Sequence, residues 1–200
     1  MINHSLIPIV AIEDPSSAVP LAKVLLNAGI GIIEVTLRSQ VALDAASRIS
    51  AEVPDIVLGV GSVLNEDHVS LAKKAGAHFI VSPGISESIN RARRNLSIPW
   101  LPGVMTPSEV MEGIDYGLDC LKLFPASSLG GEDYLKALSG PFRKTMFVPC
   151  GGILASEMTN YLRHENVISV GGGSLVPSSM LLSSEWDGIE KACRSAQKSR

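Results

Sequence analysis

The stretch Gly-Ile-Ile-Glu-Val-Thr-Leu at residues 31–37 sets one carboxyl group and one hydroxyl group within a run of branched aliphatic side chains. Aliphatic runs of this kind are typical of strands buried on both faces, as in parallel sheets. Similar runs recur along the chain, and amphipathic stretches separate them. The eight predicted strands are residues 7–12, 31–37, 56–63, 78–82, 100–104, 120–124, 145–148 and 167–170.

Helix signals occupy the intervals between these runs. Asp14 before Pro15 is a favourable helix start, and Gly29 is a favourable helix end. Thr106, with Glu109 three residues later, predicts a capping box, in which each side chain bonds the other residue's backbone. Strict alternation of strand and helix defines an α/β fold, and eight such units in 200 residues fit a single (β/α)8 TIM barrel of minimal length.

An open, doubly wound sheet is the alternative architecture. Residues 59–64 argue against it, because Leu64 stands where a dinucleotide-binding fingerprint requires its third glycine. No linker, charge run or low-complexity block divides the sequence. We therefore expect residues 1–200 to form one barrel domain.

Composition narrows the classes of function. Charged residues are 18%, aromatic residues are 4% and the net charge is −3, which fits a nucleic-acid-binding protein poorly. The low charge suggests that further copies of the chain cover part of the surface. No apolar run approaches the roughly 18 residues of a membrane span. We expect neither nucleic-acid nor membrane partners.

Cysteine and histidine usage predicts the compartment and the absence of a metal site. Cys120, Cys150 and Cys193 are odd in number and widely spaced, which favours free thiols over disulfides. The four histidines do not pair at metal-ligand spacing. The first residues also lack the basic start and cleavage site of a signal peptide. These features together predict a cytoplasmic protein.

Charged residues near the carboxyl ends of the predicted strands are the candidate site, because TIM-barrel sites lie there. Glu34 and Thr36 share one face of their strand, and we expect them and Arg38 to point into the barrel. Lys122 lies between leucines, and its burial favours a neutral amine that can form a Schiff base with a ketone. The alternatives are an internal Glu34–Arg38 ion pair and a lysine that extends to the rim.

Two glycine clusters lie near the last two predicted strands. One reads Cys-Gly-Gly at residues 150–152, and the other reads Gly-Gly-Gly-Ser at residues 171–174. Phosphate sites in TIM barrels are commonly built from the loops after strands seven and eight, where backbone N–H groups approach the anion. The clusters therefore predict an anion site. Ser62, near the end of the third strand, can offer a hydroxyl group to a carboxylate.

At these residues the sequence resembles the 2-keto-3-deoxy-6-phosphogluconate (KDPG) aldolase family. Its members are class I aldolases that often also act on 4-hydroxy-2-oxoglutarate. The resemblance covers nearly the whole chain and rests on several motifs in a specific order. They are IEVTLR (33–38), GVGSVL (59–64), SPGISE (82–87), PGVMTPSE (102–109), DYGLDCLKLFPAS (115–127), LKALSGPF (135–142), PCGGI (149–153) and VGGGSLVP (170–177).

The resemblance implies a role for each matching residue. Lys122 would form the Schiff base with the keto substrate, and Glu34 would act as general acid and base through a bound water. Arg38 and Ser62 would hold the carboxylate of pyruvate. Other matching residues would line the pocket or hold the distal phosphate: Pro83 and Phe124 beside the imine, and Gly151, Gly152, Gly172 and Gly173 at the phosphate. The resemblance also implies a homotrimer and a reaction that needs no cofactor or metal.

Several positions depart from the family pattern. Cys150 replaces a threonine, Gly173 replaces a phosphate-binding serine that Ser174 only follows, Ser127 replaces a glutamate, and Ser62 replaces a threonine. We therefore expect weaker binding of the phosphorylated substrate. Only six residues precede the first predicted strand, so we expect the family's N-terminal helix to be missing or truncated.

Two other functions remain open at this point. A sugar-phosphate epimerase or isomerase would share the glycine clusters, but it would not require Lys122 in an apolar strand. A non-catalytic barrel that binds keto acids would tolerate the loss of this lysine, whereas an aldolase would not.

Overall fold

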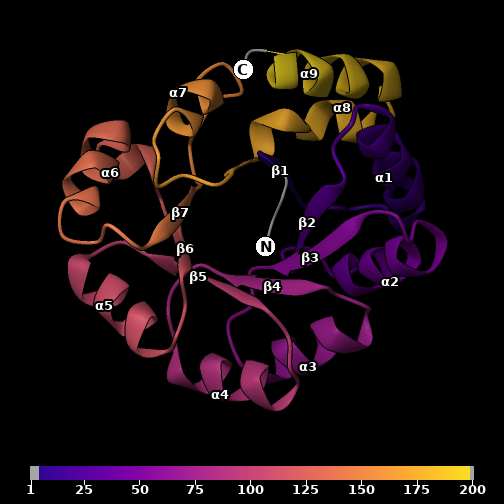
Figure 1. Cartoon of the computed structure of the whole chain (residues 1–200). Coiled ribbons are helices and arrows are strands. Elements are labelled where there is room, and N and C mark those ends of the chain that lie inside the picture. The colour runs from indigo at the N-terminus through magenta and orange to yellow at the C-terminus, as the bar shows by residue number, and fades with distance from the viewer. Residues whose placement is uncertain (1–4, 199–200) are drawn as a thin grey trace.

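A computed structural model of the chain describes residues 5–198. Its strands form one parallel sheet that curves into a barrel, and helices surround it on the outside (Figure 1). The strands are β1 Leu6–Val10, β2 Ile32–Thr36, β3 Val57–Gly61, β4 Phe79–Ser82, β5 Trp100–Val104, β6 Cys120–Leu123, β7 Met146–Pro149 and β8 Val170–Gly172. The prediction of a (β/α)8 TIM barrel is confirmed.

The strand order shows how the barrel closes. The sheet runs β7-β6-β5-β4-β3-β2-β1-β8, so each strand lies beside its neighbours in sequence and β8 pairs with β1. Two isolated parallel bridges, Phe147 with Val167 and Cys150 with Gly171, join β7 to the β8 side. Because every strand is parallel, all the carboxyl ends meet at one mouth of the barrel.

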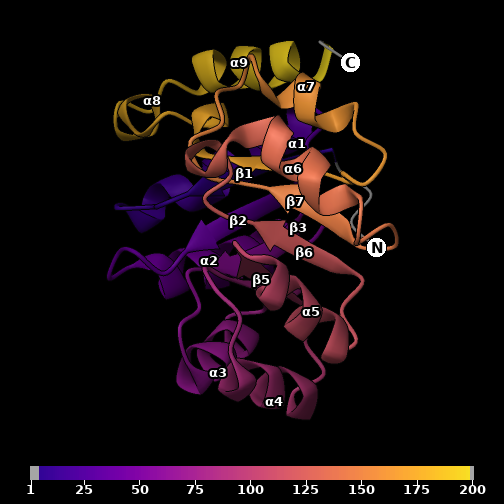
Figure 2. The same ribbon diagram turned by 90° about the vertical axis from the view of Figure 1, so that its left-hand side faces the viewer.

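The helices lie around the outside of the barrel (Figure 2). They are α1 Ala18–Asn27, α2 Ala42–Glu52, α3 Glu66–Lys74, α4 Glu87–Asn95, α5 Pro107–Asp115, α6 Gly131–Ser139, α7 Met158–Leu162, α8 Ser178–Leu182 and α9 Trp186–Lys198. Short 3₁₀ turns at Pro15–Ser17, Ser127–Leu129 and Gly173–Leu175 connect them. Within residues 5–198, no helix is long and apolar enough to cross a membrane.

The predicted helix starts form as expected. The Asp14 side chain accepts a hydrogen bond from the Ser16 backbone and caps the 3₁₀ turn that leads into α1. The capping box at Thr106 and Glu109 is complete, because both reciprocal bonds are present. These helix starts can be predicted from the sequence because capping involves only residues within one helical turn.

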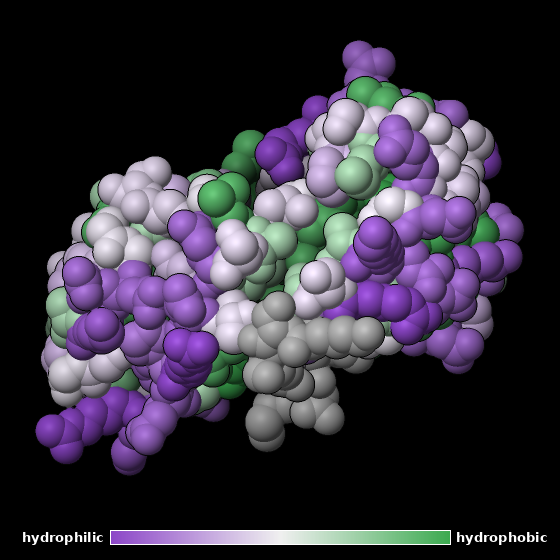
Figure 3. All heavy atoms as spheres, turned by 90° about the horizontal axis from the view of Figure 1, so that it is seen from above, coloured by the Kyte–Doolittle hydropathy of each residue, from purple (hydrophilic) through white to green (hydrophobic). Residues whose placement is uncertain are grey.

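Every residue of β2 is buried, which confirms that its aliphatic run packs on both faces. The buried side chains of α1 and α2, such as Leu21, Leu25 and Ile49, face the sheet and form the core between helices and strands. Seen from above, polar residues cover much of the surface on both flanks, and apolar atoms show in the hollow between them (Figure 3).

The eighth strand differs from the prediction. Residues 167–170 were expected, but β8 spans Val170–Gly172, and Val167 instead bridges to Phe147 of β7. Three successive glycines argue locally against a strand, whereas pairing with β1 stabilises them there. The other strands match to within two residues at each end. The N-terminal segment, where we expect the family's helix to be missing or truncated, includes residues 1–4. These four residues lie outside the described residues.

Candidate active site

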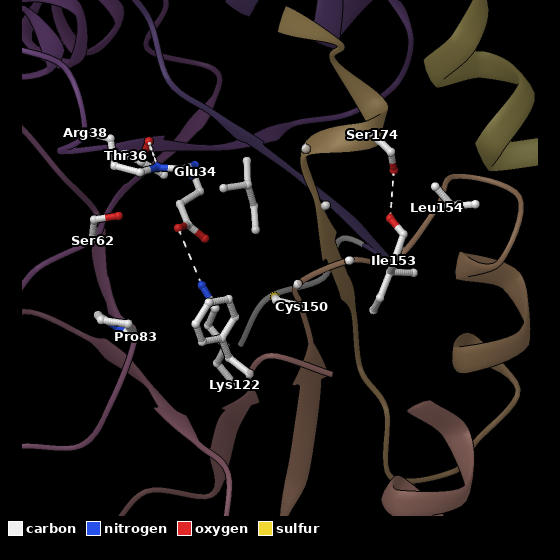
Figure 4. Close-up of a pocket in the computed structure, with 16 residues that line it drawn as sticks. Glu34, Thr36, Arg38, Ser62, Pro83, Lys122, Cys150, Ile153, Leu154 and Ser174 are labelled. Atoms are coloured by element: carbon white, nitrogen blue, oxygen red, sulfur yellow. Dashed lines mark hydrogen bonds and ion pairs between the residues drawn. The ribbon is translucent and has the colours of Figure 1, made fainter. Parts of the chain in front are cut away.

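All the predicted site residues line one cavity of about 470 Å³ at the barrel mouth. These residues are Glu34, Arg38, Ser62, Pro83, Lys122, Phe124, Cys150, Gly151, Gly152, Gly172, Gly173 and Ser174. They come from the ends of six strands and from the loops that follow them (Figure 4). The shared mouth of a parallel barrel thus brings together residues that lie up to 140 positions apart, from Glu34 to Ser174.

A buried amine and a buried carboxyl group face each other in this cavity. Lys122 Nζ on β6 lies 3.8 Å from Glu34 Oε1 on β2, and the two side chains are only 8% and 3% exposed (Figure 4). Lys122 Nζ also lies 5.1 Å from the centre of the Phe124 ring. The pair therefore spans the inside of the barrel. Lys122 does not extend to the rim, and Glu34 pairs with Lys122 rather than Arg38.

Burial sets the protonation of Glu34. It raises the pKa of the Glu34 carboxyl above its ordinary value, and the nearby charges of Lys122 and Arg38 oppose this rise only in part. A carboxyl group whose pKa rises toward neutrality exchanges protons more readily at working pH. Glu34 is thus suited to both accept and return a proton.

Arg38 is held in place at the edge of the cavity. Its Nε donates a hydrogen bond of 3.0 Å to Thr36 Oγ1, and Thr36 Oγ1 in turn donates to the Val10 carbonyl oxygen at 3.0 Å. Within residues 5–198 its two terminal nitrogens have no hydrogen-bond partner, so they can form a paired contact with a ligand carboxylate. Thr36 acts as the link between β1, β2 and this guanidinium group.

Ser62 and Pro83 form the wall opposite the glycine clusters (Figure 4). Ser62 has a backbone φ of 59°, a left-handed conformation that is uncommon for a residue other than glycine. The carbonyl oxygen of Pro83 lies close to Gly103 of β5, where an added Cβ would come within 2.1 Å of it. The absence of a side chain at Gly103 therefore lets the backbone at Pro83 lie against β5.

The far end of the cavity offers backbone groups and apolar side chains. Gly151 and Gly152 have φ values of 95° and 76°, which turn the chain tightly after β7. The Cys150 thiol is buried, and its burial raises its pKa to about 12. The thiol therefore stays protonated and is a poor nucleophile. The charged residues that line the cavity are Glu34, Arg38 and Lys122, and Cys150 lies near Lys122 (Figure 4).

Ser174 does not replace the missing serine at position 173. Its hydroxyl group donates a hydrogen bond of 3.0 Å to the Ile153 carbonyl oxygen (Figure 4). The hydroxyl hydrogen therefore already has an acceptor within the protein. Leu154, which also lines the cavity, is 58% exposed. The far end of the cavity thus has fewer hydroxyl donors than the family pattern provides.

Four residues of the cavity were not predicted as site residues: Ile9, Thr36, Ile153 and Leu154. Thr36 had a readable signal, because it shares a strand face with Glu34. Ile153 and Leu154 directly follow the first glycine cluster, but apolar residues in a loop carry no chemical signal. Among residues 5–198 there is no group of three histidine, cysteine, aspartate or glutamate side chains that could hold a metal ion.

A TIM barrel with a buried lysine beside a buried glutamate at its mouth has the arrangement of a class I aldolase. The sequence profile of the KDPG and KHG aldolase family matches residues 1–192. The chain belongs to this family. It is 40% identical over 190 residues to the KHG/KDPG aldolase of Escherichia coli K12, covering 95% of this chain and 89% of that protein.

Solved structures agree with this assignment. The KDPG aldolase of Legionella pneumophila is 36% identical, with a TM-score of 0.94 over 97% of this chain and 94% of that chain. That structure holds pyruvate captured at low pH as a covalent carbinolamine intermediate. The KDPG aldolase of Zymomonas mobilis ZM4, solved with 3-phosphoglycerate, is also 36% identical, with a TM-score of 0.91 over 97% and 91% of the two chains.

Proposed function

We propose that this protein is a class I aldolase that releases pyruvate from 2-keto-4-hydroxy acids. The candidate substrates are KDPG, which yields glyceraldehyde 3-phosphate, and 4-hydroxy-2-oxoglutarate, which yields glyoxylate. The observation that carries the proposal is the 3.8 Å pairing of Lys122 Nζ with Glu34 Oε1 inside the cavity. Membership in the KDPG and KHG aldolase family supports it.

The reaction follows from these two groups. The Lys122 amine adds to the substrate ketone, and loss of water leaves a protonated imine. Glu34 takes the proton of the C4 hydroxyl group, the C3–C4 bond breaks, and its electrons flow into the imine to form an enamine. The aldehyde leaves, Glu34 returns its proton to C3, and water hydrolyses the imine to release pyruvate and free Lys122. The imine supplies the electron sink that cleavage requires.

The remaining charged and polar groups orient the substrate. Arg38 binds the carboxylate next to the ketone, and Ser62 donates a further hydrogen bond to it. Pro83 and Phe124 line the pocket beside the imine. The backbone N–H groups around Gly151, Gly152, Gly172 and Gly173 donate hydrogen bonds to the distal anionic group.

The function is tested by measuring pyruvate release from KDPG and from 4-hydroxy-2-oxoglutarate with an enzyme-coupled assay. We expect the wild-type protein and the Lys136→Ala variant to release pyruvate, because Lys136 lies on the surface in an exposed pair with Asp133. The Lys122→Ala variant should release none. Absence of pyruvate from both substrates with the wild-type protein would refute the proposal.

We expect a lower preference for the phosphorylated substrate than a family member with serine at position 173 shows. The Gly173→Ser variant should restore a hydroxyl donor, since an added Cβ meets its nearest atom, the Ile9 carbonyl oxygen, only at 3.4 Å. One hydrogen bond to a charged group is worth about 1.5–3 kcal/mol, so the ratio of kcat/KM for KDPG to that for 4-hydroxy-2-oxoglutarate should rise about tenfold or more.

The matched control is Gly140→Ser, at the end of α6, where an added Cβ would meet its nearest neighbour, the Ala137 carbonyl oxygen, at 3.7 Å. Gly140 does not line the cavity, so this variant should leave the substrate ratio unchanged. An unchanged ratio in Gly173→Ser would show that position 173 does not contribute to the phosphate site. The Cys150→Thr variant extends the test to the second lost hydroxyl group.

The state of assembly and the location are part of the proposal. We expect residues 1–200 to act as one domain in a homotrimer, which the low charge supports. Exposed apolar side chains at Leu64, Met105 and Met111 also support it. Sedimentation equilibrium of the purified protein measures the mass of the assembly, and a monomer at micromolar concentration would contradict this expectation. The three free cysteines are compatible with the expected cytoplasmic location.

The two other functions have less support. A sugar-phosphate epimerase or isomerase would not require a buried lysine in β6 that pairs with Glu34. A barrel that only binds keto acids would not need a proton-exchanging carboxyl group 3.8 Å from the amine.

A further inference from the structure

Gly61 is the last residue of β3, at the cavity end of that strand. Glycine weakens a strand because it loses more conformational freedom on folding than other residues, so its presence requires a reason. Backbone conformation is not that reason, because the φ of Gly61 lies outside the left-handed region. Space is the remaining requirement.

The space beside Gly61 is filled by the Glu34 side chain. A Cβ added at Gly61 would lie 2.0 Å from Glu34 Oε1, 2.7 Å from Glu34 Cδ and 2.8 Å from Glu34 Cγ. These are the three nearest atoms, so the conflict concerns this one side chain. The Glu34 side chain is 3% exposed, and Lys122 Nζ lies 3.8 Å from the same Oε1 atom. The carboxyl group therefore has little room to move without leaving the amine.

The register of the sheet explains how this contact arises. In the parallel pair of β2 and β3, Thr36 stands opposite Gly61 and Glu34 stands opposite Gly59. The long Glu34 side chain extends toward the mouth of the barrel and reaches the level of Gly61, two residues further along. Any side chain at position 61 would occupy the place of its carboxyl group.

We propose that Gly61 is a positioning residue. Because Gly61 has no side chain, the carboxyl group of Glu34 can occupy the space beside the amine of Lys122. Gly61 itself takes no part in the chemistry. Its effect on turnover rests on the proposed aldolase function, whereas its contact with Glu34 does not. The two can therefore be tested separately.

Turnover is tested with the Gly61→Ala variant. We expect kcat for pyruvate release to fall about 100-fold while KM changes by less than about threefold, because a displaced general base affects the chemical step more than binding. Pyruvate with sodium borohydride should still modify Lys122, since the amine stays in place.

Gly59→Ala is the matched control. Gly59 lies on the same strand, and its added Cβ would meet the Phe79 ring at 2.2 Å, a conflict of similar severity outside the cavity. We expect this variant to lose stability while kcat stays within about threefold of wild type. Equal losses of kcat in Gly61→Ala and Gly59→Ala would overturn the positioning role.

A double-mutant cycle tests the contact without any activity. Gly61→Ala should lower the melting temperature by about 4 °C or more in the wild-type background. It should change the melting temperature by less than about 1 °C in the Glu34→Ala background, which removes all three conflicting atoms. Gly59→Ala should lower the melting temperature by the same amount in both backgrounds.

The stability measurements test the contact between Gly61 and Glu34 independently of the aldolase function. An equal cost of Gly61→Ala in both backgrounds overturns the proposal, even if the wild-type protein proves to be an aldolase. If Gly61→Ala does not fold, recovery of folding in the Gly61→Ala/Glu34→Ala double variant supports the proposal and failure to recover overturns it. A wild-type protein without aldolase activity overturns the proposed function and leaves the stability cycle interpretable.

Discussion

The Lys122→Ala variant is expected to lose pyruvate release by about four orders of magnitude or more, because no other group can form the imine. The Lys122 side chain is 8% exposed, and within residues 5–198 it is the only lysine that lines the cavity. Alanine removes the nucleophile and the cationic electron sink together. Lys122→Met, which keeps most of the side-chain volume, should show the same loss and so exclude a packing effect.

The covalent step can be measured directly by mass spectrometry of the intact protein. Incubation with pyruvate and sodium borohydride should add the mass of one reduced pyruvate imine to the wild-type protein and to Lys136→Ala. Peptide mapping should place the adduct on Lys122. An adduct of equal yield in Lys122→Ala would mean that another amine reacts, and the imine mechanism at Lys122 would be wrong.

The Glu34→Gln variant is expected to reduce turnover by about 10²- to 10⁴-fold while the imine with pyruvate still forms. Glutamine keeps the shape and a polar oxygen near Lys122 Nζ but cannot take up the proton of the C4 hydroxyl group. Because the same carboxyl group is proposed to protonate C3, the exchange of pyruvate C3 hydrogens in deuterium oxide should slow to a similar degree. Turnover and exchange would then fall together.

The control for this variant is Glu66→Gln. Glu66 forms a surface pair with Arg91 at 3.7 Å, and its side chain is 59% exposed. It should leave turnover and hydrogen exchange unchanged. If Glu34→Gln keeps rapid exchange of the pyruvate C3 hydrogens, Glu34 is not the group that moves this proton.

The raised pKa of Glu34 also predicts the acid limb of the activity profile. A general base must be deprotonated in the free enzyme, so kcat/KM falls as the pH drops through the pKa of Glu34. Burial raises that pKa, and the acid limb should therefore lie above the range of an ordinary glutamate near about pH 4.3. The residual activity of Glu34→Gln should lack this limb.

The proposed catalytic pair and the proposed phosphate site differ in how closely they match the family pattern. The lysine and glutamate of the pair match the family motifs, and they meet in the barrel. Cys150 and Gly173 replace hydroxyl-bearing residues of the family pattern, and Ser174 Oγ donates a hydrogen bond to the Ile153 carbonyl oxygen. We therefore propose that this chain keeps the groups that cleave the carbon–carbon bond, and that it binds the leaving half through backbone groups.

The predictions that depend on a few neighbouring residues are confirmed. The cap at Asp14, the capping box at Thr106 and the aliphatic run of β2 all formed as predicted. The eighth strand was misplaced because its glycines are held by pairing with β1, a partner more than 160 residues away in sequence. The flanking apolar residues of the cavity, such as Leu154, were missed because nothing in their own segment marks them.

The sequence by itself determined that the chain is an alternating α/β barrel, and it identified Lys122 and Glu34 as polar groups in apolar strands. The spacing of apolar residues and the presence of a polar residue among them carry that information, because both are properties of a few neighbouring residues. Only the tertiary structure decided that Glu34 pairs with Lys122 rather than Arg38, and that Gly61 leaves room for it. Those contacts join different strands, so they depend on the register and curvature of the closed barrel, which no local pattern encodes.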